Sequence, residues 1–230
     1  MACKNRTNEL TNIIAIDGPA GSGKSTVAKG LAKRLGFLYV DTGAMYRALT
    51  LAAVREGINL SDEEALAKLA LRVNIQLLMY EGVQKVLLDG EDVSRAIRKQ
   101  PLTEKVCFVA KLPGVRAEMV KLQRRLVKEA KGAVLEGRDI GTVVFPNAKY
   151  KFYLDAQIEK RVKRRFKEMQ EAGQEVSAKE IGEDIYRRDK SDISRAVAPL
   201  AKAKDAFYID TTQLSVDEVI KVIVDKCSIR

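Results

Sequence analysis

The hydrophobic positions of this chain fall into short apolar runs separated by longer amphipathic segments. The apolar runs have the length of buried strands and cover residues 13–16, 37–40, 132–136, 151–155 and 206–210. The amphipathic segments have helical spacing and cover residues 26–35, 44–55, 62–71, 103–111, 115–131, 159–171, 178–189 and 216–227. Strands that alternate with helices in this way predict an α/β fold, in which a parallel sheet carries helices on both faces.

One stretch departs from this alternation. Residues 73–77 and 85–88 have the character of strands and are separated by a turn at 80–82, and Asp89-Gly90 gives a second turn signal. A short helix fits residues 94–98. We therefore expect a small antiparallel unit set into an otherwise α/β chain.

Several residues predict where helices begin and end. Gly57 is suited to stop the helix at 44–55. Ser61, with Glu64 three residues later, predicts a capping box at the start of the helix at 62–71. Pro113-Gly114 predicts the break between the helices at 103–111 and 115–131.

The composition fits one large domain. The 230 residues suffice for a sizeable core, and neither a repeat nor a low-complexity linker divides them, so we expect a single domain over residues 1–230. No apolar run approaches the ~20 residues that span a bilayer. The N-terminus also lacks the apolar segment of a secretory signal. We expect no membrane association.

Cysteine and histidine usage narrows the chemistry. Cys3, Cys107 and Cys227 are odd in number and far apart, which predicts neither a disulfide framework nor a zinc site and is typical of the reducing cytoplasm. The chain has no histidine, which excludes Ser-His-Asp and Cys-His catalysis. Any catalysis must then depend on Lys, Arg, Asp, backbone amides and a bound cation.

The most specific motif lies between the first strand and the first helix. It is a complete G-x-x-x-x-G-K-[ST] phosphate-binding loop, Gly18-Pro19-Ala20-Gly21-Ser22-Gly23-Lys24-Ser25. The glycines allow backbone N–H groups to turn inward, and the following helix N-terminus adds positive potential. Lys24 can reach the outer phosphates, and Ser25 offers a hydroxyl to Mg²⁺. The motif predicts that the chain binds a nucleoside triphosphate.

Two further motifs follow predicted core strands, where open α/β sheets bind ligands. They are Asp41-Thr42-Gly43-Ala44-Met45-Tyr46-Arg47 and Glu136-Gly137-Arg138-Asp139-Ile140-Gly141-Thr142. The first is interpreted either as a phosphate site, with the Thr42 hydroxyl and Arg47, or as a strand-to-helix turn with Asp41 as N-cap. Its likeness to the Asp-Thr-Gly signature of aspartic proteases counts for little, because that site needs an all-β setting.

The charge pattern adds arginines to this picture. The net charge is +10, which suits nucleic acid, an acidic membrane, small polyanions or merely a solvated basic surface. Arg161, Arg164 and Arg165 lie on a basic helix, and Arg188 and Arg195 flank Asp192. Arginines suit phosphoryl transfer, because its catalysis is mostly positioning and charge stabilisation. The GTPase motifs D-x-x-G and Asn-Lys-x-Asp are not found.

Together with Arg195-Ala196-Val197-Ala198-Pro199-Leu200, the three motifs resemble those of bacterial cytidylate kinases in order and spacing, from about Ile13 to Val224. That family consists of monomeric nucleoside monophosphate kinases with a P-loop core, a short mobile lid and a monophosphate-binding region that contains a small antiparallel sheet. The resemblance implies a core at 13–60, 104–158 and 197–230, a monophosphate-binding insert at 61–103 and a helical lid at 159–196.

The resemblance also implies roles for individual residues. ATP-binding residues would be Gly18, Pro19, Ala20, Gly21, Ser22, Gly23, Lys24, Ser25, Thr26 and Arg161, with Ser25 toward Mg²⁺. CMP-binding residues would be Asp41, Thr42, Arg47, Cys107, Arg116, Arg138, Asp139, Arg188, Asp192 and Arg195. Catalytic residues would be Lys24, Arg138, Arg165, Arg188 and Arg195. Among these, Arg116 and Asp139 would recognise the cytosine.

One position departs from the family pattern in a way that bears on the base. Cys107 stands where the family has a serine hydroxyl near the cytosine. A thiol is a weak hydrogen-bond donor, and Thr103, one helical turn earlier, is an alternative hydroxyl. Thr42 replaces another family serine but keeps its hydroxyl.

The expected reaction is the transfer of a phosphoryl group from ATP to CMP or dCMP, with Mg²⁺ and without an organic prosthetic group. The acceptor is already a phosphate oxygen anion, so a chain without histidine can catalyse it. Two alternatives remain: a P-loop kinase for another nucleoside monophosphate or small acceptor, and a P-loop module that binds nucleic acid. The low aromatic content of 6% and the absence of Trp weigh against the second. We expect a cytoplasmic monomer with no stable nucleic-acid or membrane partner.

Overall fold

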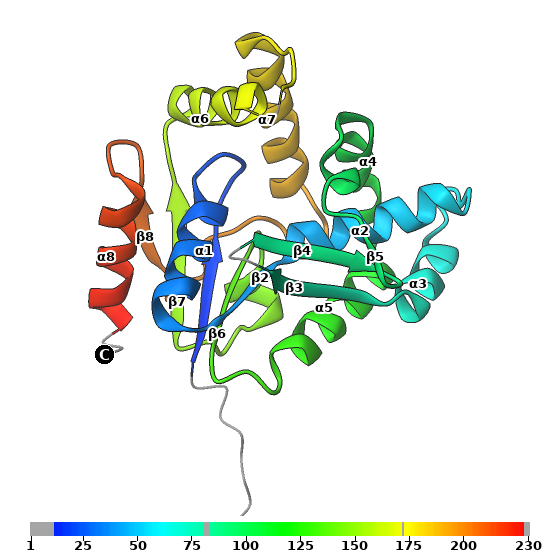
Figure 1. The fold of residues 1–230 in the computed structure, drawn as a ribbon, viewed down its shortest axis with the longest axis horizontal. Coiled ribbons are helices and arrows are strands. Elements are labelled where there is room, and N and C mark those ends of the chain that lie inside the picture. Colours follow the sequence, from blue (N-terminus) through cyan, green and yellow to red (C-terminus); the bar gives the residue numbers. More distant parts are fainter. Residues whose placement is uncertain (1–11, 81–82, 172, 228–230) are drawn as a thin grey trace, which may run out of the picture.

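A parallel sheet forms the centre of the molecule (Figure 1). The computed structural model describes residues 12–80, 83–171 and 173–227. Within these residues the sheet has five strands in the order β2-β6-β1-β7-β8. The strands are β1 (Ile13–Asp17), β2 (Leu38–Asp41), β6 (Ala133–Gly137), β7 (Tyr150–Asp155) and β8 (Phe207–Asp210). All pairings are parallel, so the predicted parallel sheet is confirmed.

Both faces of this sheet are covered by helices, which explains why the central strand β1 is apolar on both of its faces. In β1, Ile14 and Ile16 pack toward α1 (Lys24–Leu35) and α8 (Val216–Cys227), in a core that includes Leu31 and Ile223. Ile13 and Ala15 face the opposite core, formed with α2 (Thr42–Arg55) and α5 (Pro113–Val127). The prediction of helices on both faces is confirmed.

The small antiparallel unit is also confirmed, and it lies beside α2 rather than in the main sheet (Figure 1). It consists of β3 (Ile75–Tyr80), β4 (Val83–Leu88) and the two-residue β5 (Glu91–Asp92). The predicted turn at Asp89-Gly90 joins β4 to β5, with φ of 50° and 89° at its two residues. Part of the predicted turn at 80–82 lies outside the described residues. The unit is flanked by α3 (Glu63–Arg72), the 3-10 turn η1 (Ala96–Arg98) and α4 (Gln100–Ala110).

Several predicted helix starts differ from the structure, and two of the differences have a clear physical reason. The N-cap of α3 is Asp62 rather than Ser61, and the Asp62 carboxylate accepts a hydrogen bond from the amide of Ala65 at 3.0 Å. Ser61 belongs to the preceding turn, where its amide donates to the side chain of Asn59. Helix α5 begins at Pro113 instead of residue 115, because proline is well suited to the first helical position.

Two helices that lie between β7 and β8 in the chain stand over the end of β1 (Figure 1). They are α6 (Ile158–Glu171) and α7 (Ala178–Ile193), and a capping box of Ser177 and Glu180 begins α7. A five-residue π-helical turn, η2 (Ile140–Val144), follows β6 and was not expected from the sequence. Among the described residues, none of the helices has the length and apolar character required to cross a membrane.

Candidate active site

The phosphate-binding loop connects β1 to α1 with a backbone that requires glycine, as Gly18 and Gly23 illustrate. Gly18 has a φ of 150°, and a Cβ atom there would lie 2.0 Å from the carbonyl oxygen of Leu154. Gly23 is the N-cap of α1 in a left-handed conformation with a φ of 91°, and it offers no side chain to cap the helix. The first amides of α1 therefore remain suited to bind an anion from outside the helix.

Lys24 lies in the first turn of α1 and is 5% exposed. Its Nζ donates to the carbonyl oxygen of Pro19 at 2.6 Å and lies 3.4 Å from the Ser22 hydroxyl. Burial, with the positive charge of Arg138, lowers the pKa of Lys24 to about 7, although the negative charge of Glu136 acts in the opposite direction. Lys24 therefore lies at the junction between the loop and the arginines described below.

Ser25 contacts a buried carboxylate at the end of β6. Its hydroxyl donates to Glu136 Oε2 at 2.8 Å, and the hydroxyl of Tyr39 donates to Glu136 Oε1 at 2.5 Å. Burial and the negative charge of Asp41 raise the pKa of Glu136 to about 7. A cation placed beside Ser25 would relieve this cost, and both groups present oxygen, the ligand atom that Mg²⁺ prefers. The donor set thus fits the predicted Mg²⁺.

Helices α6 and α7 contact the loop at Ala20, through an ion pair and an apolar cluster. Arg161 of α6 donates to the carbonyl oxygen of Ala20 at 3.0 Å and pairs with Asp189 of α7. Asp189 in turn accepts from the amide of Ala20 at 3.1 Å. Ala20 also packs against Ile181 and Ile185 in a small apolar cluster. The predicted ATP-site residue Arg161 is therefore placed against the loop, together with Asp189.

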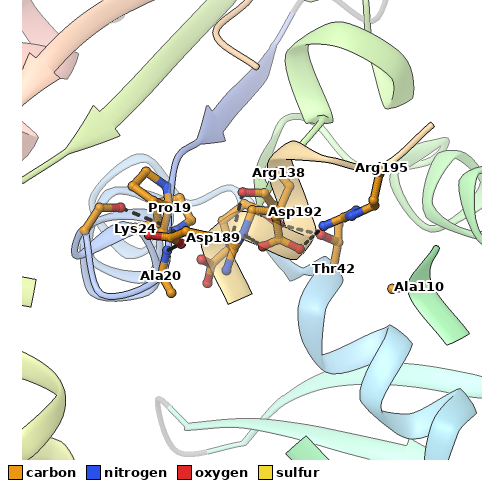
Figure 2. Close-up of polar contacts among 12 residues, drawn as sticks. Pro19, Ala20, Lys24, Thr42, Ala110, Arg138, Asp189, Asp192 and Arg195 are labelled. Carbon is orange, nitrogen blue, oxygen red and sulfur yellow. Dashed lines mark hydrogen bonds and ion pairs between the residues drawn. The ribbon is translucent and has the colours of Figure 1, made fainter. Parts of the chain in front are cut away.

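Two predicted arginines converge on one aspartate (Figure 2). Arg138, from the segment after β6, donates from Nε to Asp192 Oδ2 at 2.7 Å, and Arg195 pairs with the other oxygen of Asp192. Burial raises the pKa of Asp192, but the charges of Arg138 and Arg195 outweigh burial and hold this pKa below its usual value. These three predicted residues are brought together from distant parts of the chain.

Arg47 and Arg188 extend this cationic cluster. Arg47 donates to the Thr103 hydroxyl at 2.5 Å and to the carbonyl oxygen of Ile97 at 3.2 Å. Burial lowers the pKa of Arg47 to about 10, and the positive charge of Arg188 adds to this effect. Burial also lowers the pKa of Arg188. Its Nη2 lies 2.9 Å from Asp184 Oδ2, but the geometry of this contact is not that of a hydrogen bond. Burial and neighbouring positive charge thus both act against the charged forms of these two guanidinium groups.

The remaining predicted phosphate-site residues take structural contacts. The Asp41 carboxylate accepts from the amide of Ala44 at 2.8 Å, so its interpretation as the N-cap of α2 is confirmed. The Thr42 hydroxyl donates to the carbonyl oxygen of Glu136 at 2.7 Å. Arg165 lies 3.1 Å from Glu168 on its own helix, and its charge still contributes to the field at Arg47 and Arg188.

The predicted base-recognising residues form a buried ion pair. Arg116 of α5 is 3% exposed, and its Nη2 donates to Asp139 Oδ2 at 2.5 Å. A second nitrogen of Arg116 donates to the carbonyl oxygen of Ala110, at the end of α4. Cys107 is half-buried on α4, and its thiol donates to the carbonyl oxygen of Glu104 at 3.1 Å. Arg116 and Asp139 are therefore placed together as predicted, whereas Cys107 is engaged within its own helix.

Comparison with known proteins identifies the family. The sequence profile described as cytidylate kinase matches residues 14–228. The chain belongs to the cytidylate kinase family. It is 53% identical to the cytidylate kinase of Desulforamulus reducens over 92% of this chain and 94% of that protein. It is 50% identical to the cytidylate kinase of Caldanaerobacter subterraneus subsp. tengcongensis over 94% of both chains.

A solved structure supports the fold only. An uncharacterized protein from Eubacterium ventriosum superimposes with a TM-score of 0.51 at 16% identity, over 95% of this chain and 99% of that chain.

The family assignment confirms the resemblance carried by the sequence motifs. The order of the strands brings the three motifs together. The first two motifs come at the ends of β1 and β2, and the third comes at the end of β6, which lies between these two strands.

Sequence reasoning missed four residues of this site. They are Asp17, Tyr39, Glu136 as a partner of Ser25, and Asp189. Asp17 and Glu136 lie at the carboxyl ends of β1 and β6, so a search for acidic residues at strand ends next to the motifs would have found both. Asp189 gave no comparable signal, because its role depends on how α7 packs on the loop.

Proposed function

We propose that this member of the cytidylate kinase family transfers the γ-phosphoryl group of ATP to CMP and dCMP, giving CDP and dCDP. The observation that carries the proposal is the cationic cluster that begins at the buried Lys24 and continues through the half-buried Arg138, Arg195, Arg188 and Arg47. Two polyanionic nucleotides repel each other, and such a cluster offsets the repulsion where their phosphates meet.

The lowered pKa values support a phosphate ligand. Burial lowers the pKa of Lys24, Arg47 and Arg188, and a positively charged neighbour lowers each further. An anion bound among these groups would favour their charged forms. In the proposed roles, Lys24 spans the donor and acceptor phosphates, while Arg47, Arg138 and the Thr42 hydroxyl hold the monophosphate. Arg188, Arg195 and Arg165 stabilise the charge that develops during transfer.

The buried pair of Arg116 and Asp139 supports a cytosine base. Cytosine presents an exocyclic amine, which can donate a hydrogen bond to the Asp139 carboxylate. Uracil presents a carbonyl oxygen at the same place, which the carboxylate would repel. An unmade buried polar contact costs roughly 1–3 kcal/mol, which corresponds to about a ten- to hundredfold preference. We therefore expect CMP and dCMP to be used well above UMP.

Ser25 and Glu136 are the residues we propose to hold Mg²⁺, together with the nucleotide phosphates. When bound, this ion neutralises charge on the phosphates that take part in the transfer. The chain's own contribution is to fix the Ser25 hydroxyl through Glu136 and to present loop amides to the donor phosphates. The acceptor needs no strong general base, because its phosphate oxygen is already ionised.

We also propose that residues 159–196 act as a lid, 61–103 as the monophosphate-binding insert, and 13–60, 104–158 and 197–230 as the core. The contacts of Arg161 and Asp189 with Ala20 support the lid, since they place α6 and α7 directly on the phosphate-binding loop. Such a cover would exclude water and so limit hydrolysis of ATP.

An acceptor screen tests the proposal. ADP formation would be measured with ATP, Mg²⁺ and each of AMP, CMP, dCMP, GMP, UMP and dTMP, with a no-acceptor control. We expect the highest kcat/KM for CMP and dCMP, and about ten- to a hundredfold less for UMP. Highest activity with another monophosphate would move the chain to a different acceptor. Binding of RNA that weakens with salt, without acceptor-dependent ADP, would favour the nucleic-acid alternative.

A further inference from the structure

Asp17, the last residue of β1, holds a turn that belongs to another part of the chain. Its side chain is buried, and its Oδ1 accepts from the amide of Ile140 at 2.8 Å while Oδ2 accepts from the amide of Gly141 at 2.7 Å. These two amides begin the π-helical turn η2. The first amides of a helical turn have no partner within it, so Asp17 supplies their acceptors from outside.

The Asp17 carboxylate lies between the phosphate-binding loop and the proposed base-recognising residue Asp139. Asp17 directly precedes Gly18, the first residue of the phosphate-binding loop, and Ile140 directly follows Asp139. The register of the sheet places Asp17 beside Gly137, three residues from Ile140. A single side chain therefore connects the loop for the donor phosphates to the peptide of the proposed base-recognising residue.

Two glycines near this contact have little room for a side chain. A Cβ atom on Gly141 would lie 3.3 Å from Asp17 Oδ2 and 3.2 Å from Cδ of Lys151. A Cβ atom on Gly137 would lie 2.7 Å from both Ile140 Cδ1 and the Thr42 hydroxyl. Gly141 thus lets the turn approach Asp17 closely, and Gly137 leaves room for Ile140 and the Thr42 hydroxyl. Two acceptor oxygens then meet two adjacent donors, which is the charge-assisted arrangement that is strongest in proteins.

We propose that Asp17 is a positioning residue for nucleobase selection, because it fixes the Asp139–Ile140 peptide and so aims the Asp139 carboxylate toward the base. The inference rests on the proposed function. Asp139 itself has an irregular backbone conformation, with φ of −146° and ψ of 25°. Its carbonyl oxygen accepts hydrogen bonds from the amides of Val143 and Val144. Asp17 anchors the start of the same turn, so Asp139 is held between two sets of backbone contacts.

The substitution Asp17→Asn tests this role with little change of shape. The amide group keeps one acceptor oxygen but turns an NH₂ toward a backbone N–H, so one of the two bonds is lost. We expect the KM for CMP to rise about tenfold and the CMP over UMP preference in kcat/KM to fall about tenfold, the size of one lost charged hydrogen bond. The KM for ATP should change much less, because the loop keeps its glycines and its own contacts.

Asp210→Asn is the matched control. Asp210 also ends a parallel strand, and its carboxylate likewise holds the following loop, through the amide and hydroxyl of Thr212 at 2.9 and 2.5 Å. We expect this variant to keep the wild-type preference for CMP. If Asp17→Asn changed the KM values for ATP and CMP equally, or lowered only the thermal midpoint, the positioning role would be refuted.

A second variant covers the case in which Asp17→Asn does not fold. Gly141→Ala leaves Asp17 unchanged but places a methyl group on the turn, in close contact with Asp17 Oδ2 and the Lys151 side chain. It should lower the CMP over UMP preference in the same direction as Asp17→Asn, and an unchanged preference would contradict the inference. Failure of the proposed function is separate, because it would appear as absence of CMP-dependent ADP formation in the wild-type protein.

Discussion

The phosphate-binding loop and the nucleobase end of the site are built in different ways. The loop is one contiguous segment in which backbone geometry carries the function, with glycine required at Gly18 and Gly23. The nucleobase end is a pair of side chains, Arg116 and Asp139, which come from α5 and from the segment after β6. Phosphate is recognised mainly by charge, whereas a base is recognised by the pattern of its donors and acceptors.

This difference separates two kinds of functional loss. Damage at the phosphate end should lower the rate with every acceptor, because each acceptor brings the same charged group. Damage at the nucleobase end should change the choice among acceptors and leave the chemistry of transfer in place. Asp17 lies between the two ends and contacts the backbone next to Asp139, so it offers a way to test how independent they are.

The largest effect is expected for Lys24→Ala. Removing this buried amine should lower kcat for CMP, dCMP and UMP alike by about a thousandfold or more, because a preorganised positive charge is lost where the phosphates meet. The measurement is ADP release at saturating nucleotides, with circular dichroism to show that the variant is folded. Lys33→Ala serves as control, since Lys33 is an exposed residue of the same helix. Retention of more than about a tenth of the rate would exclude Lys24 from the transfer.

The next effect should appear at the other end of the site. Asp139→Ala should erode the CMP over UMP preference by up to about a hundredfold, because the acceptor for the cytosine amine is gone. Values of kcat/KM for the two acceptors, measured in parallel, give this ratio directly. Asp217→Ala, an exposed aspartate of α8, controls for the loss of one negative charge. A ratio equal to that of the wild type would remove Asp139 from base recognition.

The carboxylate between the two ends should make stability depend on pH. Burial raises the pKa of Asp17 from 3.8 to about 6, although hydrogen bonds from Gly141 and Ile140 act against it. The folded protein therefore holds this proton more tightly than the unfolded chain, so the stabilisation is complete below about pH 4 and is lost as the pH rises through about 6. The negative charge of Asp139 also raises this pKa, and the positive charge of Lys24 lowers it.

Urea unfolding of the wild type and of Asp17→Asn measures this dependence. The stability of the wild type relative to the variant should fall by about 2 kcal/mol between about pH 4 and pH 7. Other titrating groups are common to both proteins, so the difference isolates Asp17. A difference that did not change with pH would mean that the Asp17 carboxyl titrates normally in the fold.

The same contrast explains how much could be predicted from the sequence. The parallel sheet and the phosphate-binding loop were predictable, because each is encoded locally, by short apolar runs and by the spaced glycines of one contiguous motif. The pair of Arg116 and Asp139 was anticipated only through resemblance to the family. The contacts of Asp17 with η2 and of Asp189 with Ala20 were not predicted, because they join segments more than a hundred residues apart in the chain. Ser61 was mistaken for an N-cap, because a neighbouring aspartate competes for the same role.

The smallest effect concerns the one departure from the family pattern at the nucleobase end. The Cys107 thiol is a weak donor and is directed to the carbonyl oxygen of Glu104. If this position contacts cytosine, Cys107→Ser should raise kcat/KM for CMP relative to UMP by about two- to fivefold, because a hydroxyl makes a stronger hydrogen bond than a thiol. Cys107→Ala is the matched control and should give no gain. Equal behaviour of the serine and alanine variants would place the base contact elsewhere, with the Thr103 hydroxyl as the next candidate to substitute.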